Sequence, residues 1–402
     1  MRAALLGLAL LAALPAAAAP PDPPSAAANA EVSAFLAGLW PAAQARGVSR
    51  ATFDAALREV PGPDPAVLAR TRRQGEFARP VWDYLAGAVS GARVARGRAE
   101  AAKRADILAA IEARYGVPAP VLLAFWGAES DFGTGTGSVS TLRALATLAA
   151  AGHRGTLFRD EFLAALEILE HHDVDPARMR GSWAGAMGQV QFLPSAYLRA
   201  AVDGDGDGRR DIWASVPDSL ASIANFLRLA GWQPGLPWGA EVVLPADFDL
   251  SRYRAPLRDF AARGVRRTDG RPLAGEGEAS LFLPGGLGGP VFLVTANFEA
   301  IRAYNTSDAY ALAVGHLAER IAGSAGLAAP WPVAAPRLDG AGIRALQEGL
   351  QGRGLYDGPL DGRAGPKLRE ALRRFQIAAG LPADGYASPA MLERVRGHTP
   401  SR

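Results

Sequence analysis

Residues 120–133 read PVLLAFWGAESDFG, an apolar stretch that ends in a carboxylate and a glycine. Pro120 can open a helix in its first turn and Gly133 can end one, so we predict an apolar helix with Glu129 in its last turn. Burial and the partial negative charge of a helix C-terminus both disfavour an ionised carboxylate. We therefore expect Glu129 to be protonated near neutral pH and to act as a general acid. The alternative is a solvated glutamate at a helix end.

The start of the chain has the order of a secretory signal peptide. Met1-Arg2 precedes an apolar run from Leu5 to Leu14, and small residues follow from Ala16 to Ala19. We place the signal peptide at residues 1–19. The apolar run is too short to span a membrane, and no later stretch is apolar for long enough. We expect an exported protein, periplasmic or secreted, with no transmembrane span.

Cysteine is absent from the sequence. Neither a disulfide nor a lipid-modified cysteine is then available, so we expect a protein that is not a lipoprotein and that relies on its core for stability. The formal net charge is +3 over 402 residues. Because the basic residues form no long run, we expect no nucleic-acid partner.

The hydrophobic pattern predicts a mainly α (α+β) protein. Apolar residues at helical spacing begin at Val32, and helical periodicity returns from Phe298 to Ile321. Glycine and proline are dense between Gly231 and Pro290, where residues 241–245 and 279–284 are expected to form short strands of a small β-containing insertion.

An Ala/Pro-rich stretch divides the chain towards its end. After it, Ile343, Leu346 and Leu350 share one helix face in a short, turn-rich segment without a cluster of catalytic side chains, so we expect a binding module. The predicted boundaries are residues 20–325 for the catalytic domain, 326–336 for the linker and 337–396 for the binding module.

A second segment with chemical character is glycine-rich, GSWAGAMGQVQFLPS at residues 181–195. Its glycines let a polymer lie close to the main chain, and Ser182 and Gln191 offer neutral groups that can orient a carboxyl group or a sugar amide. The alternative is an ordinary glycine-rich turn.

Taken together, these motifs resemble the B-type lytic murein transglycosylases. The resemblance is carried by Glu129-Ser130, by residues 185–195, and by a third segment, NFEAIRAYNTSDAY at residues 297–310. It extends through most of residues 30–322. It implies a lysozyme-like α-rich catalytic domain, with Glu129 as acid/base and peptidoglycan glycan strands as the substrate. By the same resemblance the site is lined by a set of five substrate-binding residues, Ser182, Gln191, Tyr304, Asn305 and Tyr310.

The resemblance also implies the reaction. Glu129 first protonates the bond between N-acetylmuramic acid (MurNAc) and N-acetylglucosamine (GlcNAc), and then acts as base toward the 6-hydroxyl of the muramoyl sugar. This closes a 1,6-anhydro ring without water. A hydrolase normally needs a second carboxylate, but Asp131 lies off the helix face of Glu129. A hydrolytic muramidase and a non-catalytic wall-binding protein remain the alternatives.

A third motif, DGDGDGRRDIW at residues 203–213, places carboxylates at alternate positions, like the opening of an EF-hand loop. We expect a structural Ca²⁺ bound by Asp203, Asp205, Asp207 and the carbonyl of Arg209, with no organic cofactor; the alternative is an acidic turn that binds no ion. The twelfth position is Ala214 rather than glutamate. The family resemblance implies that a later carboxylate closes the site, and Asp218 is placed to do so.

The end of the chain resembles the small three-helix peptidoglycan-binding domain. The resemblance rests on Leu346-Gln347, residues 354–358, Asp361-Gly362 and residues 375–385. It implies a module that tethers the enzyme to its substrate. His171 and His172 are adjacent at a helix end, and we expect them to be solvated rather than metal-bound.

Overall fold

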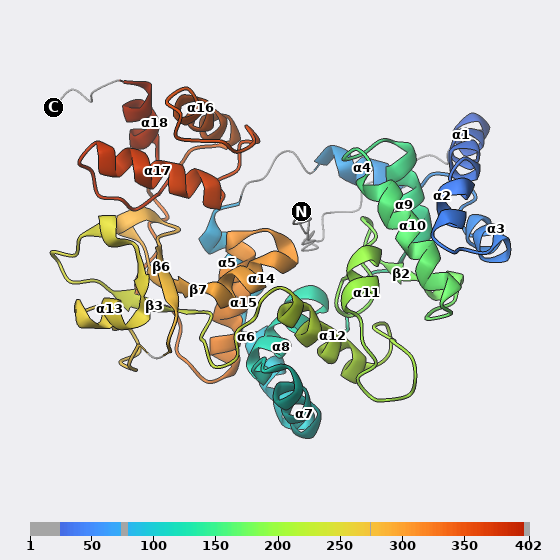
Figure 1. Cartoon of the computed structure of the whole chain (residues 1–402), viewed down its shortest axis with the longest axis horizontal. Coiled ribbons are helices and arrows are strands. Elements are labelled where there is room, and N and C mark those ends of the chain that lie inside the picture. The colour runs from blue at the N-terminus through green and yellow to red at the C-terminus, as the bar shows by residue number, and fades with distance from the viewer. Residues whose placement is uncertain (1–24, 74–78, 274, 398–402) are drawn as a thin grey trace. The chain divides into compact units, whose positions relative to one another are not determined.

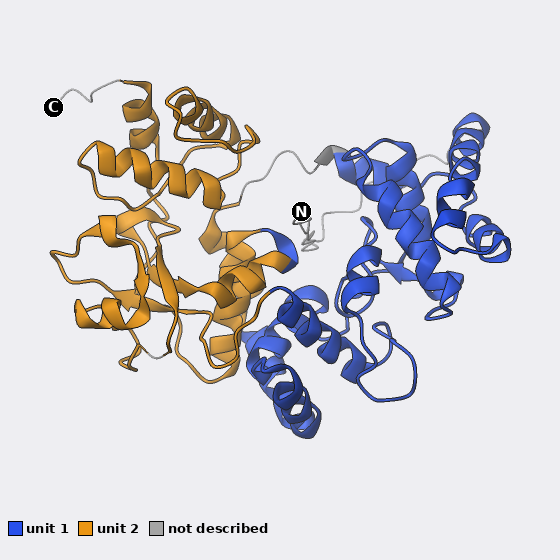
Figure 2. Cartoon of the chain, in the orientation of Figure 1, with its two compact units in different colours: residues 1–77, 91–230, 304–306 blue, residues 78–90, 231–303, 307–402 orange. Residues whose placement is uncertain are grey.

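The computed structural model describes residues 25–73, 79–273 and 275–397. The predicted signal peptide, residues 1–19, lies outside the described residues. The chain divides into two compact units, which Figure 2 distinguishes by colour. Unit 1 consists of residues 1–77, 91–230 and 304–306, and unit 2 consists of residues 78–90, 231–303 and 307–402.

Unit 1 is built almost entirely of helices. Its only described strands, β1 (Val139–Ser140) and β2 (Arg180–Gly181), pair antiparallel. Its helices are α1 (Ala26–Ala37), α2 (Trp40–Ala45), α3 (Arg50–Arg58), α4 (Pro65–Arg73), α6 (Gly91–Lys103), α7 (Ala105–Tyr115), α8 (Ala119–Ser130), α9 (Thr141–Ala150), α10 (Leu157–Glu170), the 3₁₀ helix η1 (Pro176–Arg178), α11 (Pro194–Ala200) and α12 (Val216–Leu229).

Helix α8 lies in the core of unit 1. Its residues from Val121 to Gly127 are all buried, and it packs against α6, α7 and α12. A helix that is apolar around its whole circumference is stable in water only when other elements cover every side. The apolar helix predicted from residues 120–133 is therefore confirmed.

Unit 2 contains a five-stranded sheet in the order β4-β6-β7-β3-β5, with all neighbours antiparallel. The predicted strands at 241–245 and 279–284 correspond to β3 and β6. The strands are β3 (Gly239–Val243), β4 (Arg254–Pro256), β5 (Arg266–Arg267), β6 (Glu278–Phe282) and β7 (Val291–Thr295). The helices around them are α5 (Val81–Ala88), η2 (Leu250–Arg252), α13 (Leu257–Ala262), η3 (Gly286–Gly288), α14 (Ala296–Asn305) and α15 (Asp308–Ile321). The last two residues of α14 belong to unit 1.

The continuous helical pattern expected from Phe298 to Ile321 is broken into α14 and α15. Thr306 adopts a left-handed backbone with φ 53°, and the Ser307 hydroxyl accepts a hydrogen bond from the Tyr310 N–H and so caps α15. The chain therefore turns where apolar periodicity alone predicts continuation.

The C-terminal module is a three-helix bundle, as expected. Figure 1 shows its helices together at the red end of the chain. Leu346, Leu350 and Leu372 lie in its apolar core. The helices are α16 (Gly340–Gln351), α17 (Pro366–Ala378) and α18 (Pro389–Arg396).

Helix α17 holds this module against the rest of unit 2. Arg369 forms an ion pair with Asp308 at 2.5 Å, and its guanidinium lies 4.8 Å from the centre of the Phe282 ring. Arg373 is only 3% exposed, donates to the carbonyl of Leu281 in β6, and lies over the Tyr253 ring. Charged side chains are seldom so buried unless they are paired, so these contacts mark a built interface.

The Ala/Pro-rich linker is packed onto unit 2. The backbone N–H groups of Ala328 and Ala329 donate to the Glu241 carboxylate at 2.8 and 2.9 Å. Trp331 lies 5.9 Å from Trp82 of α5, measured between ring centres. The first half of the predicted linker is therefore bound to the rest of unit 2, whereas residues 333–336 are exposed.

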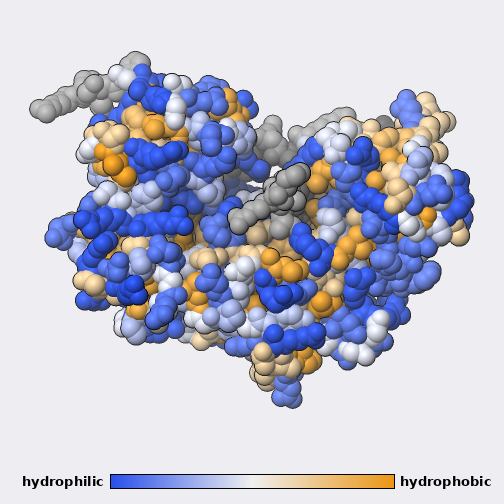
Figure 3. All heavy atoms as spheres, in the orientation of Figure 1, coloured by the Kyte–Doolittle hydropathy of each residue, from blue (hydrophilic) through white to orange (hydrophobic). Residues whose placement is uncertain are grey.

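The face drawn in Figure 3 is mostly hydrophilic, with apolar residues scattered or in small groups. Among residues 25–73, 79–273 and 275–397, no single helix has the length and apolar character of a membrane span; α7 and α8 reach both only as a pair, bent by 108°.

Candidate active site

The end of helix α8 determines where Glu129 lies. Pro118 precedes the helix in an extended conformation and Pro120 stands in its first turn. The helix ends at Ser130. Asp131 (φ 50°) and Phe132 (φ 60°) follow it with left-handed backbones, so the helix ends before the glycine stop that was expected at Gly133. Left-handed backbone is costly for such residues and persists only where tertiary contacts hold it.

Two arginines of α6 provide such contacts. The Asp131 carboxylate accepts from Arg93 Nε at 3.3 Å and from Arg96 Nη1 at 2.6 Å. The Asp131 side chain is thereby bound to guanidinium groups, which agrees with the expectation that it does not serve beside Glu129 as a second catalytic carboxylate.

Glu129 is half-buried and lies near the Tyr304 phenol at the end of α14. Both residues belong to unit 1. Burial first, and then the charge of Glu129, raise the pKa of Tyr304 well above its ordinary value, so this phenol stays neutral. Its hydroxyl donates to the Val190 carbonyl at 2.6 Å. Glu129 and the glycine-rich segment thus meet at Tyr304.

The ring of Tyr304 is held by aromatic packing. Its centre lies 4.8 Å from Phe125 of α8, 5.6 Å from Phe192 of the glycine-rich segment and 4.6 Å from Phe226 of α12. Aromatic pairs at these distances fix ring orientation as well as burying area. Three separate elements therefore set the position of one phenol.

The glycine-rich segment folds back on itself in a tight turn. Ser182 N donates to the Ala186 carbonyl at 2.7 Å, and Met187 N donates to the Phe192 carbonyl at 2.8 Å. A Cβ on Gly181 would lie 1.9 Å from the Ala186 carbonyl oxygen, so only glycine fits there. The Ser182 hydroxyl accepts from the Ala186 N–H at 3.1 Å. Ser182 thus shapes the turn, and its O–H hydrogen is left to donate.

Gln191 has a left-handed backbone with φ 52°. Its amide nitrogen donates to the carbonyls of Thr136 and Gly188, each at 2.9 Å. Since the nitrogen binds protein, the amide oxygen is the group that can accept a hydrogen bond from a sugar hydroxyl or amide. The strained backbone is typical of a side chain held for a function.

The other glutamine of this segment was not among the site residues predicted from the sequence. Gln189 is 5% exposed, and its Oε1 accepts from the indole N–H of Trp126 at 2.9 Å. Its carbonyl accepts from the Ser130 hydroxyl at 2.6 Å. Burying an amide without hydrogen-bond partners is costly. A glutamine among apolar residues was therefore the one sequence signal that could have predicted a buried, hydrogen-bonded Gln189.

The remaining predicted substrate residues fall in different units. Asn305 is 7% exposed and belongs to unit 1 with Tyr304. Tyr310 is 2% exposed on α15 and belongs to unit 2. Within unit 1, the structure therefore brings Glu129, Tyr304 and the glycine-rich segment together.

The acidic loop also lies in unit 1. Asp203, Asp205 and Asp218 each offer a carboxylate oxygen within 4.8 Å of the others, an all-oxygen donor set that suits Ca²⁺. Asp218 is fully buried, burial raises the pKa of its carboxyl, and its oxygens accept from Gly204 N at 2.8 Å and from Asp211 N at 2.6 Å. Asp207 is outside this group; its carboxylate accepts from the Arg209 N–H at 2.8 Å.

The adjacent histidines are not part of a metal cluster. His171 and His172 are both exposed at the end of α10. The potential metal-binding group found among the described residues is the acidic loop.

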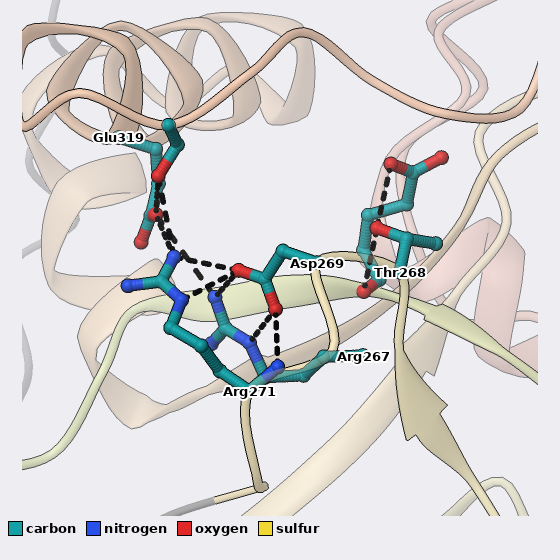
Figure 4. Close-up of polar contacts among 7 residues, drawn as sticks. Arg267, Thr268, Asp269, Arg271 and Glu319 are labelled. Atoms are coloured by element: carbon teal, nitrogen blue, oxygen red, sulfur yellow. Dashed lines mark hydrogen bonds and ion pairs between the residues drawn. The ribbon is translucent and has the colours of Figure 1, made fainter.

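A second polar cluster lies in unit 2 and is drawn in Figure 4. Asp269 accepts from Arg267 and Arg271, each at 2.6 Å at the closest, and Arg271 also pairs with Glu319 of α15 at 2.9 Å. It borders a cavity of about 140 Å³ that is also lined by Trp238 and His316. Because these charges are paired with one another, the cluster ties the β5 edge of the sheet to α15.

Comparison with known proteins places the chain in a family. A family model described as the transglycosylase SLT domain matches residues 31–319, well over half of the sequence. The chain belongs to the SLT transglycosylase family. A second model, for a peptidoglycan binding domain, matches residues 339–395 of this transglycosylase. The predicted family and the mainly α fold with a C-terminal module are confirmed.

Solved structures of this transglycosylase family support the match along most of the chain. SltB3 from Pseudomonas aeruginosa, in complex with NAG-anhNAM-pentapeptide, is 46% identical with a TM-score of 0.82, covering 91% of this chain and 99% of that one. Escherichia coli Slt35 in complex with calcium is 28% identical with a TM-score of 0.60, covering 73% and 93%.

A curated relative matches over a shorter length. Membrane-bound lytic murein transglycosylase B of Escherichia coli (strain K12) is 35% identical over 215 residues. That match covers 52% of this transglycosylase and 58% of the relative, so it spans less than two thirds of that protein.

Proposed function

We propose that this protein is a lytic transglycosylase, a carbon-oxygen lyase that cleaves the MurNAc-GlcNAc β-1,4 bond of peptidoglycan and leaves 1,6-anhydroMurNAc ends. The observation that carries the proposal is the arrangement at the end of α8. Glu129 lies beside the neutral phenol of Tyr304, whereas the next carboxylate, Asp131, is bound by Arg93 and Arg96. The reaction needs only one carboxylate, and Glu129 is the one that we assign to it.

Glu129 acts twice in the proposed reaction. It first gives its proton to the glycosidic oxygen as the bond to the muramoyl C1 breaks, and the N-acetyl group of that sugar stabilises the developing cation. The ionised Glu129 then takes the proton of the 6-hydroxyl while O6 bonds to C1. The first proton stays on the leaving oxygen, Glu129 regains a proton from the 6-hydroxyl, and water is neither consumed nor released. The intramolecular attack has a high effective molarity, which removes the need for an enzymic nucleophile.

The groups around Glu129 suit a neutral sugar polymer. The Ser182 hydroxyl can donate a hydrogen bond and the Gln191 amide oxygen can accept one. Tyr304 and Asn305 belong to the same unit as these two residues. We assign these four residues, and Tyr310 from the family motif, to substrate binding. The hydrogen bonds that hold Ser182 and Gln191 support this assignment because they pre-orient both side chains.

The C-terminal module binds the same polymer in this proposal. We keep residues 20–325 as the catalytic domain, 326–336 as the linker and 337–396 as the wall-binding domain. The contacts of Arg369 and Arg373 support a module that has a fixed orientation relative to the rest of unit 2.

Two further features belong to the proposal. The exported location, periplasmic or secreted, rests on residues 1–19, and N-terminal sequencing of protein recovered outside the cytoplasm tests it. A structural Ca²⁺ would be held by the carboxylates of Asp203, Asp205 and Asp218 and would fix the loop between α11 and α12. Asp207 and the carbonyl of Arg209 were also predicted from the sequence, but the Asp207 side chain lies outside this cluster, so the proposal does not depend on it.

Mass spectrometry of the muropeptides released from purified sacculi tests the reaction. Products that end in 1,6-anhydroMurNAc support the lyase. Reducing MurNAc ends instead would identify a hydrolytic muramidase on the same fold, and binding without any released product would identify a wall-binding protein.

A further inference from the structure

Gln189 joins the helix that carries Glu129 to the acidic loop. On one side, its Oε1 accepts from the Trp126 indole and its carbonyl accepts from the Ser130 hydroxyl. On the other side, its backbone N–H donates to the Ile212 carbonyl at 2.8 Å and its Nε2 donates to the Trp213 carbonyl at 3.2 Å. Four hydrogen bonds therefore run through one buried residue.

The bonds on the α8 side bracket Glu129. Trp126 is three residues before Glu129 and Ser130 is one residue after it, so both lie within one helical turn of the carboxylate. Ser130 Oγ also accepts from Gly133 N at 3.0 Å, which fixes the left-handed exit from the helix. Gly133 also leaves room for the Gln189 amide, since a Cβ at residue 133 would lie 2.6 Å from Gln189 Oε1.

The bonds on the loop side reach a firmly held segment. The Asp211 carboxylate accepts from Trp213 N and Ala214 N, at 2.9 and 2.8 Å. The Asp211 N–H donates in turn to the buried Asp218 carboxylate. The carbonyls that Gln189 contacts are therefore fixed from their other side.

The chemistry of the amide matches its place. An indole can only donate and a backbone carbonyl can only accept, so a side chain between them must accept at one end and donate at the other. A glutamine amide does both without charge, whereas an apolar side chain of the same length leaves the Trp126 donor and the Trp213 acceptor without this bond.

We propose that Gln189 is a positioning residue for catalysis: it fixes the last turn of α8, and with it Glu129, relative to the acidic loop. The inference rests on the proposed function, because it takes Glu129 as the acid/base. Gln189 acts through Trp126 and Ser130 rather than on the substrate. Its loss lets the carboxylate shift from the glycosidic oxygen, and a shift of about 1 Å is enough to lower a rate 10²-fold.

The test uses the full chain with three variants. Gln189→Met keeps the length of the side chain and removes both amide bonds, and Trp126→Phe removes the donor at the other end. Asn225→Leu is the matched control, because Asn225 is also a buried amide in unit 1 that donates to a backbone carbonyl, that of Ala200 at 2.9 Å. Turnover on solubilised glycan strands and amide hydrogen exchange are measured for each.

We expect kcat to fall by about 10- to 100-fold in Gln189→Met and in Trp126→Phe, with KM within about twofold of the wild type. The kcat of the double variant should be no more than about twofold below that of the less active single variant, since both changes remove the same link. Asn225→Leu should keep its kcat. An unchanged kcat in Gln189→Met, losses that multiply in the double variant, or an equal loss in Asn225→Leu would each overturn the proposal.

Hydrogen exchange separates this inference from the assigned reaction. Amides of residues 127–133 should exchange faster in Gln189→Met and at the wild-type rate in Asn225→Leu, whatever products the wild type releases. Unaltered exchange there in Gln189→Met would reject the positioning role even if the wild type forms anhydro products. A wild type that releases none would reject the assigned reaction alone.

Discussion

Asp131 Oδ2 accepts a hydrogen bond from Arg96 Nη1 at 2.6 Å, two residues after Glu129 and outside the helix that carries it. The left-handed backbone of Asp131 turns its side chain toward α6, where Arg93 also binds it. The two neighbouring acidic residues therefore have different surroundings: one is half-buried beside a phenol, and the other is neutralised by two guanidinium groups.

Asp131→Asn should lower stability by about 1 kcal/mol or less, because its ion pairs are partly exposed and such pairs contribute little. Cleavage should persist to within about tenfold of the wild type, since one carboxylate carries both proton transfers. Urea unfolding and the rate of anhydromuropeptide release measure the two effects. Complete loss of cleavage in a folded Asp131→Asn protein would point to a two-carboxylate mechanism.

Glu129→Gln should lower cleavage by at least about 10³-fold, because the amide can neither give nor take the proton. Binding to sacculi should remain, since the change keeps the shape of the side chain. Glu112→Gln is the matched control: Glu112 lies on α7, and its Oε2 accepts from Ala119 N at the start of α8, a bond that glutamine can keep. Turnover by Glu129→Gln close to that of Glu112→Gln would remove Glu129 from the reaction.

Tyr304→Phe should destabilise the protein by about 1–3 kcal/mol, because the buried carbonyl of Val190 loses its donor while the ring contacts stay. It should also reduce kcat, since the phenol fixes the glycine-rich segment beside Glu129. Urea unfolding together with steady-state rates checks both outcomes. A variant as stable and as active as the wild type would show that this hydroxyl is dispensable.

Calcium should raise the melting temperature. An ion that binds only the folded state adds about 2.7 kcal/mol to the free energy of unfolding when its concentration is about one hundred times its Kd. Each kcal/mol raises the melting temperature of a domain of about 150–250 residues, such as unit 1, by about 2–4 °C. Melting is compared in CaCl₂ and in a chelator. The increase should vanish in the double variant Asp203→Asn, Asp205→Asn and persist in Asp207→Asn, whose side chain is outside the cluster. No response in the wild type would exclude a structural calcium.

His316 should make unit 2 less stable in acid. Burial first, with the nearby Arg320 charge adding to it and Glu319 opposing it, lowers the pKa of His316 to about 4. Between pH 6.5 and 4 the unfolded chain binds a proton that the folded unit does not, so stability falls with falling pH, by about 3 kcal/mol from this group.

Unfolding of His316→Gln over the same pH range checks this assignment. The variant should lose less stability than the wild type on acidification, because glutamine takes up no proton when the unit unfolds. Parallel curves for the two proteins would mean that His316 titrates alike in the folded and unfolded chains.

Much of this architecture could be predicted from local patterns. The apolar run between Pro120 and Gly133 located α8, apolar periodicity located the first helix of the C-terminal module, and glycine and proline density located the β-containing region. These features depend on residues a few positions apart, which the sequence displays directly. The sequence did not reveal β7, which is a short apolar run at residues 291–295. Such a run is too short and too uniformly apolar for its periodicity to distinguish a strand from a helix.

The candidate site shows the same division. The sequence alone determined that a carboxylate would stand at the end of an apolar helix, and that a glycine-rich segment and an acidic loop would accompany it. Only the tertiary structure decided that Arg93 and Arg96 bind Asp131, that Gln189 links Trp126 to the carbonyl of Trp213, and that the Asp207 side chain lies outside the acidic cluster. Those contacts join residues far apart in the chain, and a hydrogen bond or ion pair forms only where folding brings donor and acceptor within about 3 Å of each other.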